Sequence, residues 1–123
     1  MGLDVYAVHS PEVGLTEADV LAFYEAGIEL CGGIYSGDGG SFRGKVYDTL
    51  ILDLTEVGLY QHWIPPETVR KMAEALHRVD PQEFEKDCAE KYSWENYSAH
   101  TIEHLRKFFD ICVERGLGLA GSW

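Results

Sequence analysis

The segment from Ser36 to Leu76 constrains the fold most, because a glycine-rich loop opens it and two consecutive prolines divide it. Between the loop and the prolines, the apolar residues recur at helical spacing: Val46, Tyr47, Leu50, Ile51 and Leu54. The alternation of Leu50, Leu52 and Leu54 alone would also fit a strand, but the longer run favours an amphipathic helix. We therefore predict a helix over 44–58, closed by a glycine.

Helix-start and helix-stop signals divide the rest of the chain. Pro65 and Pro66 are accepted at a helix start because the first-turn N–H groups have no intrahelical partner. Thr16, with Asp19 three residues later, has the pattern of a capping box. Together with the glycines and prolines elsewhere, these signals predict helices over 16–30, 44–58, 65–76, 81–90 and 98–115.

Two terminal segments are expected to form a small sheet. Alternating apolar residues predict a strand over 3–8, and 117–121 is long enough for another, whose glycines suggest the close approach of a second backbone. A two-stranded sheet is marginally stable alone, so either Ile34 and Tyr35 add a third strand or a second subunit pairs with an exposed edge. The predicted fold is α+β: one domain over 1–123, with a two- or three-stranded sheet formed by the chain ends and covered by four to five helices.

Helical projection predicts which side chains face the core. In the helix over 16–30 the predicted inward residues are Val20, Leu21, Tyr24 and Ile28. In the last helix the inward direction is set by Ile102, Leu105 and Phe109, and His100 and His104 lie more than about 100° from it. Both histidines are therefore expected on the solvent face.

Charge and composition exclude several classes of partner. The chain has 21 acidic and 10 basic residues, and this excess of negative charge repels nucleic-acid phosphates and anionic lipids. Its first residues show no basic region before a long apolar stretch, and no apolar run reaches about eighteen residues, so neither a signal peptide nor a membrane span is expected. Its three cysteines form no C-x-x-C pair and are expected to be reduced thiols. The sequence predicts a cytoplasmic protein that binds neither nucleic acid nor membranes and needs no cofactor.

One motif with catalytic potential lies in the last predicted helix. Residues 100–104, HTIEH, match the H-x-x-E-H pattern, in which two imidazoles one helical turn apart bind Zn²⁺ and the Glu activates water. In these five residues the chain resembles the inverted-zincin peptidases, and the resemblance implies a metal site of His100, Glu103 and His104. Those enzymes need a further acidic ligand well downstream, and only residues 105–123 follow. The simpler interpretation is two surface histidines; a metal-dependent hydrolase is the alternative hypothesis.

The glycine-rich loop suggests a second site. Residues 39–45 fit G-x-x-x-x-G-K, but a valine follows the lysine where a phosphate-binding P-loop needs Ser or Thr for Mg²⁺, and the chain is too small for the parallel sheet of nucleotide hydrolases. Nucleotide hydrolysis is therefore excluded. Amides at a helix start beside Arg43 and Lys45 still predict an anion-binding spot. Alternatively the loop only turns a corner, and Arg43 pairs with a carboxylate such as Asp38 or Asp48.

Aromatic residues with polar tips are candidates for a pocket beside this loop. They are Tyr47, Tyr60, His62, Trp63, Trp94 and Trp123. Such residues often lie at binding surfaces, and core packing is the alternative. The ligand-binding residues predicted from this part of the chain are Ser41, Arg43, Lys45, Tyr47, Tyr60 and Trp63.

Four segments resemble a group of small uncharacterised bacterial proteins: MGLDVY at the start, SGDGGSFRGKVY, LYQHWIPPETV, and LRKFF followed by GLGLAG. The resemblance covers nearly the whole chain and implies a bacterial, single-domain, cytoplasmic protein, but no activity. Because no complete catalytic set is present, the sequence predicts a non-enzymatic binding or protein-interaction module, and a homodimer, with its functional surface near the glycine loop.

Overall fold

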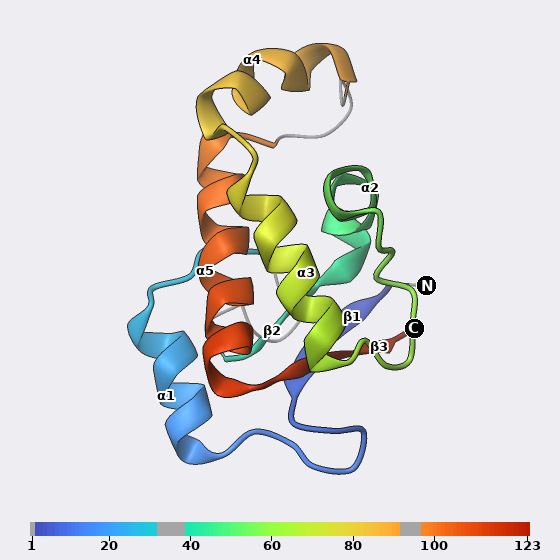
Figure 1. Ribbon diagram of the computed structural model, residues 1–123, viewed down its shortest axis with the longest axis vertical. Coiled ribbons are helices and arrows are strands. Elements are labelled where there is room, and N and C mark those ends of the chain that lie inside the picture. Colours follow the sequence, from blue (N-terminus) through green and yellow to red (C-terminus); the bar gives the residue numbers. More distant parts are fainter. Residues whose placement is uncertain (1, 32–38, 92–96) are drawn as a thin grey trace.

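Three antiparallel strands form the small sheet of this protein (Figure 1). The computed structural model describes residues 2–31, 39–91 and 97–123. Strand β1 (Asp4–Val8) lies between β2 (Ser41–Arg43) and β3 (Gly118–Ser122). Asp4 pairs with Arg43 on one side and with Ser122 on the other, so the two ends of the chain meet. The predicted α+β fold, with sheet strands from both chain ends, is confirmed.

The described part of the chain also contains five helices. They are α1 (Glu17–Glu25), α2 (Gly44–Thr55), α3 (Pro66–His77), α4 (Pro81–Lys91) and α5 (Ala99–Arg115). Figure 1 shows α3 and α5 running side by side, α4 across their far end, and α1 against the other side of α5. Each predicted helix is present, although the first ends at Glu25, before its predicted end at residue 30.

Local capping explains two of these boundaries. At the start of α1 the Thr16 hydroxyl accepts a hydrogen bond from the Asp19 N–H (3.1 Å), and the Asp19 carboxylate accepts one from the Thr16 N–H (2.8 Å). This is the predicted capping box, which satisfies two amides that have no partner within the helix. At the end of α5, Gly116 has φ 68°, the left-handed conformation that glycine adopts without steric strain.

The helices cover one face of the sheet. Val5, Ala7, Phe42 and Leu119 are buried on that face, whereas Tyr6 points to the opposite side and is partly exposed. On α2, Tyr47, Leu50 and Ile51 are buried and Leu52 is exposed, which confirms the helix there and excludes the strand.

The third strand was not predicted where it occurs. Residues 41–43 were assigned to the glycine loop, but they form β2, with Phe42 opposite Val5. Phe42 is almost fully buried, and its ring centroid lies 4.9 Å from that of Phe108, so the core fixes this strand. The alternative candidates, Ile34 and Tyr35, lie outside the described residues.

Of the four residues predicted to face inward from the first helix, only Ile28 is buried, and it lies beyond the end of α1. Val20, Leu21 and Tyr24 are 41%, 53% and 68% exposed, and the buried residues of the helix are Asp19 and Phe23. The Phe23 ring centroid lies 4.9 Å from that of Phe108, and Asp19 bonds to α5. A pattern of apolar residues alone misses this orientation, because half of the buried stripe is a carboxylate.

Both outer edges of the sheet are hydrogen-bonded to other parts of the chain. Along β3, Ile64 and Leu119 exchange two N–H···O bonds (2.7 and 2.9 Å), and the Gly121 N–H donates to the Gln61 carbonyl (3.0 Å). Along β2, the Arg43 N–H donates to the Cys31 carbonyl (2.7 Å). Because bonded edges offer fewer groups for pairing, the homodimer predicted from the sequence is not expected to form by strand addition here.

We expect Gly121→Ala to lower the free energy of unfolding by about 2 kcal/mol. A Cβ at this position would lie 2.5 Å from the Gln61 carbonyl oxygen and 3.1 Å from that of Leu59, which confirms the predicted close approach of another backbone. Urea unfolding measures the effect. Gly14→Ala is the control, because a Cβ there meets nothing within 4 Å. Equal effects of the two substitutions would contradict this explanation.

Candidate functional site

The outward side of α1 presents apolar side chains to solvent. Leu15, Val20, Leu21 and Tyr24 line a hollow of about 380 Å³, together with Thr16 and Glu17. We call these four apolar residues the α1 face. Since residues three and four apart are neighbours on a helix, Glu17 and Glu25 flank Leu21 on the same side. The α1 face is thus an apolar stripe with a glutamate at each end.

The charged residues in the sequence segment that carries this face are all acidic. From Pro11 to Cys31 there is no Lys, Arg or His, and the charged residues are Glu12, Glu17, Asp19, Glu25 and Glu29. All of these except Asp19 are exposed. The exposed charges that this segment places beside the α1 face are therefore negative, and they attract cationic groups.

A buried carboxylate fixes the orientation of α1. Asp19 is 2% exposed; its Oδ2 lies 2.6 Å from His9 Nε2 and its Oδ1 accepts a hydrogen bond from Arg115 Nε at 2.5 Å. Burial by itself would raise the pKa of Asp19, but the hydrogen bonds from Thr16, Arg115 and His9 outweigh it and hold that pKa well below its usual range. Asp19 is thus ionised at neutral pH and ties the inward side of α1 to α5, which leaves the apolar stripe outside.

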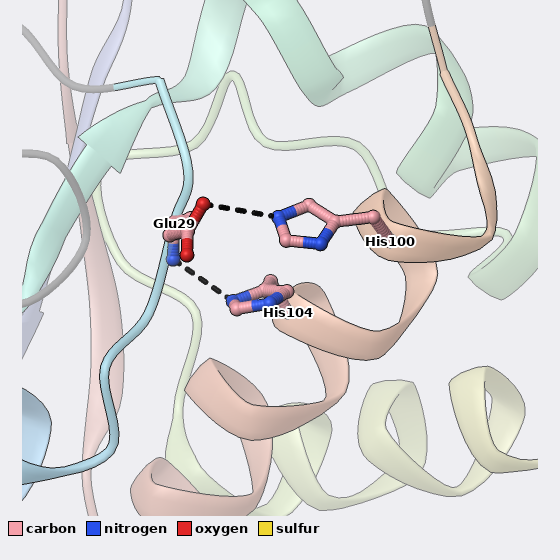
Figure 2. A group of neighbouring side chains, drawn as sticks. All are labelled: Glu29, His100 and His104. Carbon is pink, nitrogen blue, oxygen red and sulfur yellow. Dashed lines mark hydrogen bonds and ion pairs between the residues drawn. The ribbon is translucent and has the colours of Figure 1, made fainter.

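A second candidate site lies where the segment after α1 crosses α5 (Figure 2). His100 Nε2 is 3.5 Å from Glu29 Oε2, and the Glu29 backbone N–H donates to His104 Nδ1 at 2.9 Å. The two imidazole centroids are 3.9 Å apart, and one potential ligand atom from each of the three residues lies within 4.8 Å of the others. We call Glu29, His100 and His104 the Glu29 cluster.

The solvent-facing position predicted for both histidines is correct only for His100. His104 is 6% exposed, because the chain at Glu29 folds over it. Burial lowers the pKa of His104, and the positive charges of His100 and Lys107 lower it further. His104 is therefore a neutral imidazole at pH 7.

The Glu29 cluster differs from the metal set implied by the H-x-x-E-H pattern. Glu103 is exposed and is not part of the cluster, whereas Glu29 reaches the histidines from a distant part of the sequence. In the zincin-like pattern the motif Glu must activate water beside the metal. Among the described residues, the two histidines therefore have a carboxylate partner in Glu29. The motif glutamate, which the hydrolase hypothesis requires beside the metal, is not there.

The start of α2 is covered by the sheet. The Lys45 N–H donates to the Leu3 carbonyl (3.2 Å), and a Cβ on the buried Gly44 would lie 2.6 Å from Val5 and 2.7 Å from Leu3. An anion at this helix start would have to displace these groups.

Ser41 and Tyr47, two predicted ligand residues, are buried. The Tyr47 hydroxyl accepts a hydrogen bond from the Cys31 N–H (2.8 Å), and burial raises the pKa of Tyr47 to about 12. Tyr47 therefore supports the core.

Of the two partners predicted for Arg43, only Asp48 can be examined in the part of the chain that the structure describes. Asp38 lies outside this part, and Asp48 Oδ1 accepts a hydrogen bond from the Leu59 N–H (2.7 Å). The Arg43 guanidinium lies against the backbone of Gly2. Its strand neighbour is Asp4, whose buried Oδ1 has no hydrogen-bond partner among the described residues. Asp4 is directly paired with Arg43 in the sheet, and opposite charges at such a pair attract.

Among the described residues, the aromatic candidates fall into separate places. Tyr60 and His62 contact the C-terminal Trp123 at ring-centroid distances of 5.6 and 4.7 Å, and Trp63 lies against the position a Gly118 side chain would take. Tyr47 is in the core, and Trp94 lies outside the described residues. Tyr60 thus packs against the last residue of the chain, and Trp63 packs against β3.

Comparison with models of protein families, with curated proteins and with solved structures finds no match to this chain. Function must therefore be inferred from the geometry of the α1 face and of the Glu29 cluster.

Proposed function

We propose that this chain is a non-enzymatic protein-interaction module that binds a basic, amphipathic helix of a partner protein on the α1 face. One observation carries the proposal: an exposed apolar stripe, hollowed between its side chains, lies in a stretch whose charged residues are all acidic. A contiguous apolar patch with a polar rim is typical of protein-binding surfaces.

The shape of the surface suits a helical partner. Helix-in-groove recognition uses anchors three and four residues apart, which insert between apolar side chains. The hollow of about 380 Å³ beside Leu21 and Tyr24 is wide open to solvent, so an aliphatic or aromatic anchor of a partner helix can lie on it from outside.

Charge selects the partner. With 21 acidic and 10 basic residues, the chain attracts a cationic segment over long distances, and the glutamates beside the α1 face favour Lys and Arg around the apolar anchors. In a two-fold symmetric dimer through this face, Glu17 and Glu25 would face acidic residues of the second copy. A different, basic protein is therefore the better partner, and the homodimer predicted from the sequence is not proposed at this face.

The structure describes no helix that is long and apolar enough to cross a membrane.

Leu21→Glu should weaken binding of a basic amphipathic helix at least about tenfold, because it places a charge in the centre of the apolar stripe. The probe is a synthetic helix of Leu and Lys only, titrated into the protein by calorimetry. The added glutamate increases the attraction for lysine, so a loss of affinity reports on apolar contact. Leu52→Glu on α2 is the matched control, since Leu52 is exposed to a similar extent (47%), and it should leave affinity unchanged.

Three outcomes would contradict the proposal. The Leu and Lys helix fails to bind the unchanged protein, or Leu52→Glu weakens binding as much as Leu21→Glu does. A helix of Leu and Glu that binds equally well would remove the argument from charge. Sedimentation gives a further check: a dimer that Leu21→Glu converts to a monomer would identify a second copy as the occupant of the α1 face.

A further inference from the structure

We propose that Glu29, His100 and His104 form a binding site for a divalent transition-metal ion of the Zn²⁺ type. This inference is independent of the partner-binding function, because none of the three residues lines the hollow of the α1 face. The site joins the segment after α1 to the first turns of α5 (Figure 2).

The spacing of the ligand atoms is close to that of a metal site. With bonds of about 2.0–2.2 Å, the ligand atoms of a tetrahedral Zn²⁺ lie roughly 3.4 Å apart. His100 Nε2 and Glu29 Oε2 are already 3.5 Å apart, and the full set lies within 4.8 Å. Both side chains are more than half exposed, so they can rotate over the remaining distance without disturbing the core.

His104 supplies the fixed ligand. Its Nδ1 accepts a hydrogen bond from the Glu29 N–H, so this nitrogen has a lone pair and no proton. A metal ion needs the same lone pair, so binding replaces the hydrogen bond by a coordination bond and releases the Glu29 amide. His100 lies one helical turn earlier on the same side of α5, the spacing at which two imidazoles hold one ion.

The ligand types define the class of metal. Imidazole nitrogens favour Zn²⁺, Ni²⁺ and Cu²⁺, whereas Mg²⁺ and Ca²⁺ prefer sites made of oxygen ligands alone. Two imidazoles and one carboxylate fill three positions of a tetrahedral ion, and the partial exposure of the site leaves the fourth to water. Because Glu103 is not in the cluster, the site as described binds a metal without a general base.

Metal binding is tested on the full chain without a His tag. Calorimetric titration with Zn²⁺ should show one ion per chain, and His100→Ala and Glu29→Gln should each weaken binding at least about tenfold. Both residues are exposed, so these variants should fold even if a change at the buried His104 does not. Titration with Co²⁺, followed by visible absorption, should show a spectrum that each variant loses.

Two control variants define the site. His77→Ala removes another surface histidine, which pairs with Asp110 at 2.7 Å but has no third ligand among the described residues. Glu103→Gln changes the motif glutamate. Neither should alter the affinity for Zn²⁺. The proposal is overturned if no ion binds, if His100→Ala and Glu29→Gln leave binding intact, or if Glu103→Gln weakens it as much as Glu29→Gln does.

Discussion

Replacing Phe108 with alanine should lower the free energy of unfolding by about 4 kcal/mol. Phe108 lies on α5 and is fully buried, and its ring centroid is 4.9 Å from those of both Phe23 and Phe42. It therefore joins α1 and β2 to the longest helix. Truncation removes the apolar contacts with α1 and with β2. It leaves a cavity that α1, β2 and α5 cannot fill by moving toward one another.

Urea unfolding followed by circular dichroism measures this loss. Tyr24→Ala is the control, because Tyr24 is also aromatic but mostly exposed, and its truncation should change stability by less than about 0.5 kcal/mol. A similar small effect for Phe108→Ala would contradict the assignment of Phe108 to the centre of the core.

Asp19→Ala should cost about 3 kcal/mol. The substitution removes the capping box of α1 and leaves Arg115 without its carboxylate partner. The expected loss is at the lower end for a buried ion pair, because the side chains of Arg115 and His9 are one-third exposed and regain water. Glu17→Ala, in the same first turn but exposed, should cost no more than about 1 kcal/mol. Equal losses would show that the helix start matters and the buried pair does not.

The same carboxylate predicts an acid-dependent loss of stability. The folded protein lowers the pKa of Asp19, so the unfolded chain takes up this proton at a higher pH than the folded chain does. The stabilisation is therefore fully present above the unfolded pKa of about 4 and is lost as the pH falls below it. We expect the free energy of unfolding, measured at about pH 7, 4 and 2.5, to fall less with decreasing pH for Asp19→Asn than for the unchanged protein. Parallel curves would contradict this role of Asp19.

The positions of the helices could be predicted because their signals are local. Thr16 and Asp19 form the expected capping box, Gly116 ends α5, and the apolar spacing from Val46 to Leu54 identifies α2. Each signal acts over a few residues and needs no knowledge of the fold.

The orientation of α1 could not be predicted in this way. Its buried stripe, Asp19 and Phe23, and its exposed stripe, Val20 and Tyr24, differ by one residue along the helix. Apolar spacing favours the second stripe. Contacts with distant residues reverse the choice: Asp19 bonds to Arg115, 96 positions away, and Phe23 packs on Phe108. The candidate docking surface is therefore visible only in the folded chain.

The Glu29 cluster could not be predicted for the same reason, since it depends on a contact between distant residues. The sequence shows His100 and His104 one turn apart, but their carboxylate partner lies 75 positions before His104. The motif predicts Glu103, a neighbour in sequence, as the glutamate beside the histidines. In the fold this place is taken by Glu29. Strand β2 was missed for a similar reason, since Phe42 is held by Phe108 and by pairing with Val5.

Amide chemical shifts of the ¹⁵N-labelled protein test the central claim most directly. During titration with the Leu and Lys helix, the account predicts that the shifts concentrate on residues 15–25, around the α1 face, and are smaller on α2 and near Trp123. These two places also have exposed apolar side chains, at Leu52 and at Tyr60 with Trp123, so they serve as internal controls. Shifts that centre on α2 or on the C-terminal aromatic residues, with residues 15–25 unchanged, would contradict the assignment of the α1 face as the partner-binding surface.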